Sequence, residues 1–274
     1  MQKKHKLIFI HGMGEGSSQD AYDDMLFNLT LLLSAESKTK FIELFEPVFV
    51  HWHDKTAQGE ELVFKRAFPQ FEIPRHFTSL EIFSDLNRAA RYFITYFIGD
   101  VVAYTDENDN GIRKAVQQEL LAHCADAPYS IIAHSLGSVI AFDFLYYLFA
   151  KNQFFYPTNS TSTPSVVKPY QENFRNFFTM GSPIGLFFMR KSDLWKDNFN
   201  NLINPVSKHW LNFYHPYDPI AYPLQGFFAS NTNNPKTLRD IEVDTGSLLN
   251  SHTGYWENMD VAKKIAKILS VSEV

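Results

Sequence analysis

A serine stands at a sharp corner of the sequence, in the stretch Ala133-His134-Ser135-Leu136-Gly137. An apolar run precedes this corner and an apolar-periodic segment follows it, which predicts a strand, a tight turn and a helix. Small residues stand two before and two after Ser135, where the two backbones must pass close to each other. Such a nucleophile elbow holds a serine hydroxyl beside the N-terminus of a helix. The pattern indicates a nucleophilic serine, although an ordinary strand-to-helix turn capped by Ser135 also fits it.

A serine hydroxyl becomes a good nucleophile only when a base accepts its proton and a carboxylate orients that base. On a nucleophile elbow these groups follow in the order serine, acid, histidine, on loops at the carboxyl ends of strands. Asp218 comes just after an apolar run that ends at Tyr214, and His252 lies between the last predicted strand and the C-terminal helix. We therefore expect Ser135 as the nucleophile, His252 as the base and Asp218 as the acid.

Other acids and histidines lie near these positions. Asp244 follows the last predicted strand, where the histidine is expected, and Asp143 lies on the elbow helix, pointing away from the loops. His134 is adjacent to the serine, and we expect it to shape the turn. His11 and His215 lie near the other expected site residues and are predicted to support them rather than to react.

A glycine-rich corner, His11-Gly12-Met13-Gly14-Glu15-Gly16, follows the first apolar run. Its spacing fails the dinucleotide template because Ser17 replaces the glycine, and no Gly-Lys-Ser/Thr follows to make a phosphate loop. Glycine also lets the backbone approach a ligand closely. We expect N–H groups around Gly12 and Met13, together with the N–H of Leu136, to form an oxyanion hole.

Apolar runs that predict strands alternate with stretches of helical spacing along the whole chain. Strands are predicted around 6–10, 48–50, 131–133, 174–180, 210–214 and 240–243, and helices around 21–33, 112–120, 136–148 and 261–269. This alternation predicts a single α/β domain over residues 1–274, with a mostly parallel sheet covered by helices on both faces. Residues 152–172 are rich in Ser, Thr, Pro and Asn, which indicates a loop insertion or a mobile lid near the active site.

The composition excludes several classes of protein. A net charge of −5 without a basic run gives no reason to expect a nucleic-acid partner. Cys124 is the one cysteine, so no internal disulfide can form, which suits a reducing compartment. No stretch reaches the roughly 20 apolar residues of a spanning helix, and no signal segment stands at the N-terminus. We expect a cytoplasmic protein whose oligomeric state the sequence leaves open.

Two further patterns have an ordinary and a functional interpretation. His51 and His53, followed by Asp54, could share one strand face as metal ligands, but no third ligand is near, so polar strand-end residues are the better interpretation. We therefore expect no metal and no cofactor. The range 77–104 is rich in Phe, Tyr, Ile and Leu and is predicted to be core. It could instead form an apolar wall over a cleft, or a surface for transient membrane contact.

Four segments resemble the lipases and esterases of the α/β-hydrolase superfamily: Ile10–Gly14, Ala133–Ser138, Phe178–Ile184 and His215–Tyr222. The last two look particularly like the DDHD-type phospholipases, in which a T-x-G-S-P strand end and an H-P-x-D-P-x-A-Y segment accompany an H-S-L-G-S elbow. The resemblance covers residues 6 to about 256. It implies an α/β-hydrolase fold with Ser135 as nucleophile, Asp218 as acid and His252 as base. The chain departs from that group in having no cluster of four metal-type residues and no added lipid-targeting domain.

These observations predict a metal-independent serine hydrolase that cleaves carboxylic esters, with a small-molecule or lipid ester as its substrate. Phospholipids are among the lipid esters that the resemblance suggests. Thioesters and amides remain open as substrates because the same triad cleaves them. A non-catalytic binding protein that kept the hydrolase fold, or a peripheral membrane module built on 77–104, are the alternatives from other classes.

Overall fold

The structure is a computed structural model that describes residues 3–12, 19–37, 40–52, 55, 61–62, 65–66, 98–105, 111–156, 164–190, 192–200, 202–228, 236–246 and 251–272. Within these ranges six parallel strands form one sheet, in the order β2-β1-β3-β4-β5-β6. The strands are β1 (His5–Ile10), β2 (Phe45–Val50), β3 (Tyr129–His134), β4 (Phe174–Met180), β5 (His209–Tyr214) and β6 (Leu238–Glu242). Each overlaps a predicted strand, and the expected α/β fold is confirmed.

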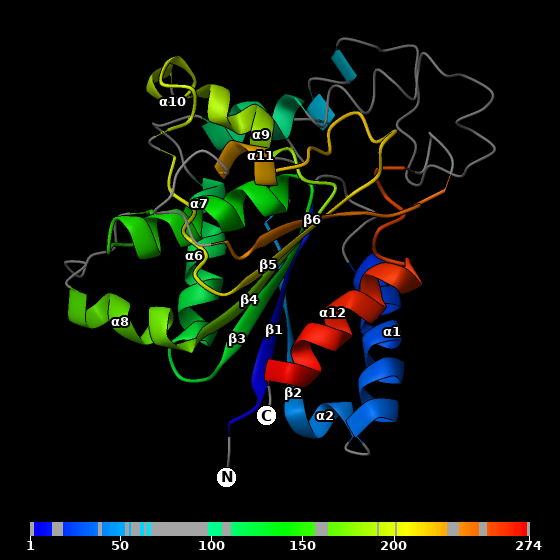
Figure 1. Ribbon diagram of the computed structural model, residues 1–274. Coiled ribbons are helices and arrows are strands. Elements are labelled where there is room, and N and C mark those ends of the chain that lie inside the picture. The colour runs from blue at the N-terminus through cyan, green and yellow to red at the C-terminus, as the bar shows by residue number, and fades with distance from the viewer. Residues whose placement is uncertain are drawn as a thin grey trace.

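Helices cover both faces of this sheet (Figure 1). The helices α1 (Gln19–Ser37) and α12 (Met259–Ser272) lie together on one face, with the short α2 (Phe41–Leu44) below them. The helices α6 (Gly111–Cys124) and α7 (Leu136–Ala150) lie on the other face. Because successive side chains of a strand point to opposite faces, Leu7 and Phe9 join the α1–α12 core while Ile8 and Ile10 join the α6–α7 core. Strands buried on both faces read as continuous apolar runs, which is why the sequence predicted them.

Short helices lie beyond the carboxyl ends of the strands, near the start of α7 (Figure 1). They are α9 (Ile184–Phe187), the 3₁₀ turn η3 (Phe188–Arg190), α10 (Ser192–Lys196) and α11 (Gln225–Phe228). Their aromatic side chains pack edge to face: the Phe188 ring lies 5.2 Å from that of Phe227 and 5.8 Å from that of Phe142 on α7. Much of the high aromatic content is therefore packed beside the elbow helix.

Residues 152–172 do not form the expected lid where the structure describes them. The helix α8 (Pro164–Asn173) lies where the strands begin (Figure 1). The Tyr129 hydroxyl at the start of β3 donates to the Tyr170 carbonyl at 2.8 Å, and the Asn173 amide donates to the Ala125 carbonyl at 2.7 Å. Ser135 follows the opposite end of β3, so α8 cannot cover it. Over residues 164–172 the structure has a helix where the composition indicated a loop. Pro164 stands at its first position, where proline is tolerated, Pro169 lies inside it, and Val167 is buried in the core. Residues 157–163 lie outside the described ranges.

The range 77–104 is described only from residue 98 onward. Residues 98–105 form a helix, and Tyr104 is fully buried among residues of the α6–α7 core, as the core interpretation predicts for that position. Residues 77–97, for which core was predicted and an apolar wall was the alternative, lie outside the described residues. No helix in the described part of the chain is both long enough and apolar enough to span a membrane.

Candidate active site

Ser135 occupies a strained corner between β3 and α7. Its backbone has φ 53° and ψ −131°, a region that residues other than glycine seldom adopt. The Ser135 N–H donates to the Met180 carbonyl at 3.0 Å, and the Ser135 carbonyl accepts from the Ser138 N–H at 3.0 Å. These bonds hold the corner from both sides, so the predicted strand, turn and helix are all present.

The elbow needs small residues because β1 passes directly against it. A Cβ on Gly137 would lie 2.2 Å from the His11 carbonyl oxygen and 2.7 Å from that of Ile10, distances that no side chain tolerates. A Cβ on Gly12 would lie 2.5 Å from Cβ of Ser135, so the end of β1 also approaches the serine itself. Ala133 is fully buried between Ile10 and Thr179 in the strand register.

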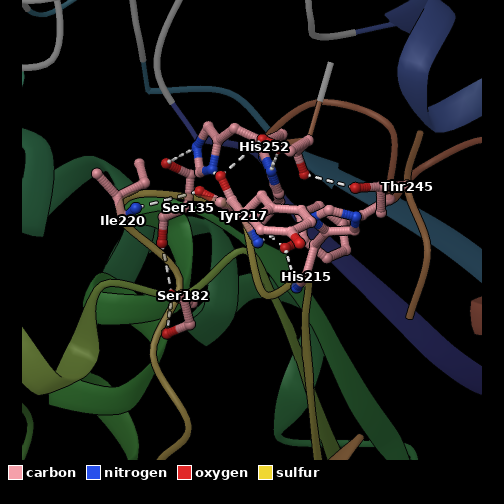
Figure 2. A network of polar contacts seen from close by, with 12 residues as sticks. Ser135, Ser182, His215, Tyr217, Ile220, Thr245 and His252 are labelled. Carbon is pink, nitrogen blue, oxygen red and sulfur yellow. Dashed lines mark hydrogen bonds and ion pairs between the residues drawn. The ribbon is translucent and has the colours of Figure 1, made fainter. Parts of the chain in front are cut away.

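His252 and Asp218 line up with Ser135 in one hydrogen-bonded row. Figure 2 shows His252 beside Ser135. Nε2 of His252 lies 2.9 Å from Oγ of Ser135, and its Nδ1 lies 2.9 Å from Oδ2 of Asp218. Asp218 follows β5 and His252 follows β6, so the loops after three strands meet at one edge of the sheet. An N–H at Nδ1 suits the carboxylate, which leaves Nε2 to accept the serine proton.

The Asp218 carboxylate is buried and well satisfied. Its Oδ1 accepts the Ile220 N–H at 3.1 Å, and its Oδ2 accepts the Tyr255 hydroxyl at 2.9 Å as well as His252. Burial acts to raise the pKa of Asp218, but the hydrogen bond and charge of His252, with the Ile220 and Tyr255 donors, outweigh it and lower the pKa below 3.8. The group is therefore a carboxylate at neutral pH and can stabilise an imidazolium.

His134 points toward the candidate base rather than only shaping the turn. Its Nε2 lies 2.6 Å from the His252 carbonyl oxygen, and the two rings lie 4.8 Å apart. Burial, followed by the charge of His252, lowers the pKa of His134 to about 3. His134 is thus neutral, and its Nε2–H donates to the backbone of His252.

The other candidate acids and histidines are engaged elsewhere. Asp244 is 89% exposed at its side chain and lies 3.6 Å from Nε2 of His215. Asp143 forms a two-pronged ion pair with Arg190, with N–O distances of 3.0 and 3.1 Å. The His11 ring stacks on the Trp52 ring, with 5.1 Å between the ring centroids, and the His11 Nδ1 lies 2.5 Å from the Gly12 carbonyl oxygen. The structure therefore brings Ser135, His252 and Asp218 together and leaves these rivals outside that row.

The expected oxyanion donors are placed in part. Leu136 is the first residue of α7, where helical N–H groups have no partner within the helix. Gly12 lies against Ser135, since a Cβ on Gly12 would be 2.5 Å from Cβ of Ser135. Met13 lies outside the described residues.

Sequence reasoning did not single out three residues that support this row. Tyr255 donates to Asp218. Ser138 lies with its Oγ 2.5 Å from the Ser135 carbonyl oxygen and 2.7 Å from Oγ of Ser182 (Figure 2). Ser138 and Ser182 belong to the segments Ala133–Ser138 and Phe178–Ile184 that resemble the hydrolases, so the sequence did offer a signal for them. Tyr255 belongs to no such pattern.

The suggested metal pair is not tested as a whole. His51 is exposed, whereas His53 and Asp54 lie outside the described residues. Among the residues with described positions, no three His, Cys, Asp or Glu side chains gather as metal ligands.

Comparison with known proteins supports the resemblance seen in the sequence. Residues 172–242 match the DDHD domain. This stretch runs from the end of α8 to the end of β6 and includes Asp218. An intracellular phospholipase A1 from Caenorhabditis elegans is 33% identical over 94 residues, which make up 34% of this chain and 10% of that protein. The match thus spans a tenth of that relative. The similarity to the DDHD-type phospholipases is confirmed.

A solved structure of a dienelactone hydrolase from Anabaena variabilis also matches, with a TM-score of 0.39 and 14% identity over 98% of this chain and 86% of that one.

Proposed function

We propose that this chain is a serine hydrolase that cleaves carboxylic esters, with Ser135, His252 and Asp218 as its catalytic residues. The observation that carries the proposal is the unbroken row in which 2.9 Å contacts join Ser135 to His252 and His252 to Asp218. The distant similarity to a phospholipase A1 supports the same reaction class.

In the first half of the reaction, Oγ of Ser135 attacks the ester carbonyl carbon while Nε2 of His252 takes the hydroxyl proton. The carbonyl oxygen becomes an oxyanion, which the N–H groups of Leu136 and of the Gly12–Met13 corner stabilise. Loss of one such donor typically costs about 3 kcal/mol of barrier. The Asp218 carboxylate stabilises the imidazolium that forms.

In the second half, the proton on His252 passes to the leaving alkoxide, which departs as the alcohol and leaves an acyl group on Ser135. A water molecule then attacks the acyl carbon while His252 takes a proton from it. Collapse of this second intermediate releases the carboxylic acid and returns the proton to Ser135. The residues thus account for hydrolysis without a metal or a cofactor.

We propose a lipid ester as the substrate class. The C. elegans relative is named a phospholipase A1. Aromatic side chains pack just beyond Ser182, since the ring of Phe227 lies within 3.2 Å of a Cβ built on Gly185. Leu186 and Met189 in this region are 40% and 64% exposed, which suits transient contact with a lipid surface. Thioesters and amides are the alternative substrates of the same triad.

We also propose one domain over residues 1–274 and action inside the cell. The relative is named intracellular. The single thiol, Cys124, is buried, and burial raises its pKa above the usual range. A chain with one cysteine forms no internal disulfide, which suits a reducing compartment.

The proposal is tested by assaying the purified chain on p-nitrophenyl esters from acetate to palmitate and on phospholipid vesicles. We expect turnover that increases with acyl length and is lost in Ser135→Ala. Ser130→Ala is the matched control, because Ser130 is an equally buried serine on β3 that bonds to His5 and Asn176 instead. Absence of turnover on every ester, or equal turnover in Ser135→Ala and Ser130→Ala, would show that the proposal is wrong.

A further inference from the structure

The hydroxyl of Tyr255 joins the loop after β5 to the loop that carries His252. Tyr255 is fully buried. Its oxygen lies 2.9 Å from Oδ2 of Asp218 and 2.8 Å from the backbone nitrogen of His215.

The direction of both hydrogen bonds follows from their chemistry. A backbone N–H can only donate, so the Tyr255 oxygen accepts the bond from His215 through a lone pair. The single hydroxyl proton is then left for Oδ2 of Asp218, which as a carboxylate can only accept. Oδ2 therefore accepts from Tyr255 and from His252 at the same time.

The Tyr255 ring has little freedom to swing away from this position. Gly181, at φ +56°, lies so close that a Cβ on it would be 2.9 Å from the ring edge of Tyr255. The His134 ring lies 5.8 Å away on the same side. The position of the hydroxyl is thus set by packing as well as by its two hydrogen bonds.

We propose that Tyr255 is a positioning residue for the reaction: it holds the Asp218 carboxylate facing His252 and limits how strongly that carboxylate attracts the His252 proton. This inference rests on the proposed hydrolase function. Oδ1 is held by the Ile220 N–H, so Tyr255 supplies the bond that fixes the rotation of the other oxygen. Without it, the Asp218 carboxylate is held only by the Ile220 N–H and by His252, and its charge is shared with fewer donors.

The effect on pH dependence has a definite sign. When His252 is neutral, the Asp218 carboxylate depends on the Tyr255 donor. When His252 is an imidazolium, its charge already stabilises the carboxylate. Loss of the Tyr255 donor therefore destabilises the neutral state more than the imidazolium state. The pKa of the pair therefore rises. Other titratable groups near this pair are His134 at the end of β3, His215 after β5, Asp244 beyond β6 and His11 after β1. The variant replaces none of them, although the His215 N–H loses the oxygen that accepts its hydrogen bond.

The test compares Tyr255→Phe with Tyr129→Phe. Tyr129 is also fully buried, and its hydroxyl donates to the Tyr170 carbonyl at the far end of β3. Kinetics on a p-nitrophenyl ester are measured from pH 5 to 9, with the melting temperature of each variant. For Tyr255→Phe we expect kcat to fall about 10-fold or more, as for a lost bond to a charged group. We expect KM within about 2-fold and the acidic limb of kcat/KM at higher pH.

Tyr129→Phe is expected to keep the wild-type kcat and acidic limb even where its melting temperature falls. The proposal is overturned if Tyr255→Phe keeps the wild-type kcat and acidic limb, or if Tyr129→Phe changes them equally.

A measurement on the wild-type protein does not depend on turnover or on the folding of a variant. In proton NMR the Tyr255 hydroxyl should exchange slowly and show a cross peak to the Nδ1 proton of His252, because both bond to one oxygen. A rapidly exchanging hydroxyl without that cross peak overturns the assignment. Failure of the hydrolase proposal is seen separately, as wild-type protein without turnover or as turnover that survives in Ser135→Ala.

Discussion

Two carboxylates of this molecule, Asp218 and Asp143, have similar partners and different chemistry. Asp218, after β5, accepts hydrogen bonds from a buried tyrosine and from His252. Asp143, on α7, accepts from the buried Tyr104 at 2.5 Å and from Arg190 at 3.0 and 3.1 Å. A carboxylate and a tyrosine therefore do not by themselves make a reactive site.

The third partner makes the difference. An arginine stays protonated at every accessible pH, so its pair with Asp143 is a permanent clamp between α7 and η3. A neutral histidine has a ring nitrogen that can accept a proton, so His252 beside Asp218 can take up and release a proton during a reaction. Nε2 of His252 also faces a serine, whereas the Arg190 guanidinium lies over the rings of Tyr104 and Phe187, at 5.7 and 5.0 Å.

Asp218→Asn should break the reactive pair with the largest effect. An amide cannot hold His252 in the tautomer that accepts the serine proton, so kcat is expected to fall about 10⁴-fold. The circular dichroism spectrum should stay that of the wild type. A kcat within about tenfold of the wild type would contradict the role given to Asp218.

Asp143→Asn should break the clamp without touching the reaction. Removing one partner of a partly buried ion pair leaves Arg190 without its counter-charge, and the unfolding free energy should fall by about 2 kcal/mol. Urea denaturation measures this loss, and kcat at a temperature where the variant is folded should be unchanged. If kcat fell as far as in Asp218→Asn, the two carboxylates would not differ in the way proposed.

His134 adds a second test near the reactive pair, because it is a buried histidine that stays neutral. Its pKa is about 3 in the folded protein against an ordinary value of 6.5. Between these values the unfolded chain binds a proton that the folded chain does not, so stability falls as the pH falls from about 6.5 toward 3.

One group contributes at most about 1.4 kcal/mol per pH unit to that slope. His134→Gln keeps an N–H donor for the His252 carbonyl but cannot titrate. Its unfolding free energy, measured by urea denaturation between pH 4 and 6.5, should depend less on pH than that of the wild type. An unchanged slope would mean that His134 is not the neutral group described above. The low pKa of Asp218 does not disturb this measurement, since its contribution to stability is lost only as the pH falls below about 3.8.

Much of the framework could be predicted because it depends on local sequence. Strands buried on both faces read as continuous apolar runs, as Leu7 to Ile10 and Ile131 to Ala133 do. The elbow is marked locally by small residues two before and two after Ser135, although the approach of β1 is what leaves no room for a side chain at position 137. The order Ser135, Asp218, His252 follows from parallel strands that end at one edge.

The rest depends on contacts between residues distant in sequence. Tyr255 and Asp218 are 37 positions apart, and His134 and the His252 carbonyl are 118 apart, so no periodicity or spacing marks either pair. The helix α8 was mistaken for a lid because Ser and Pro are common in loops, whereas Val167 packs into the core and stabilises the helix there.

The central claim is that Ser135 is activated by the row it forms with His252 and Asp218. Reaction with a fluorophosphonate probe, followed by mass mapping of the labelled peptide, tests this directly because the probe needs the activated serine but no particular substrate. One label per chain on Ser135, greatly slowed in Asp218→Asn and absent in Ser135→Ala, is the predicted result. Folded wild-type protein that takes no label, or takes it on another residue, would contradict the claim.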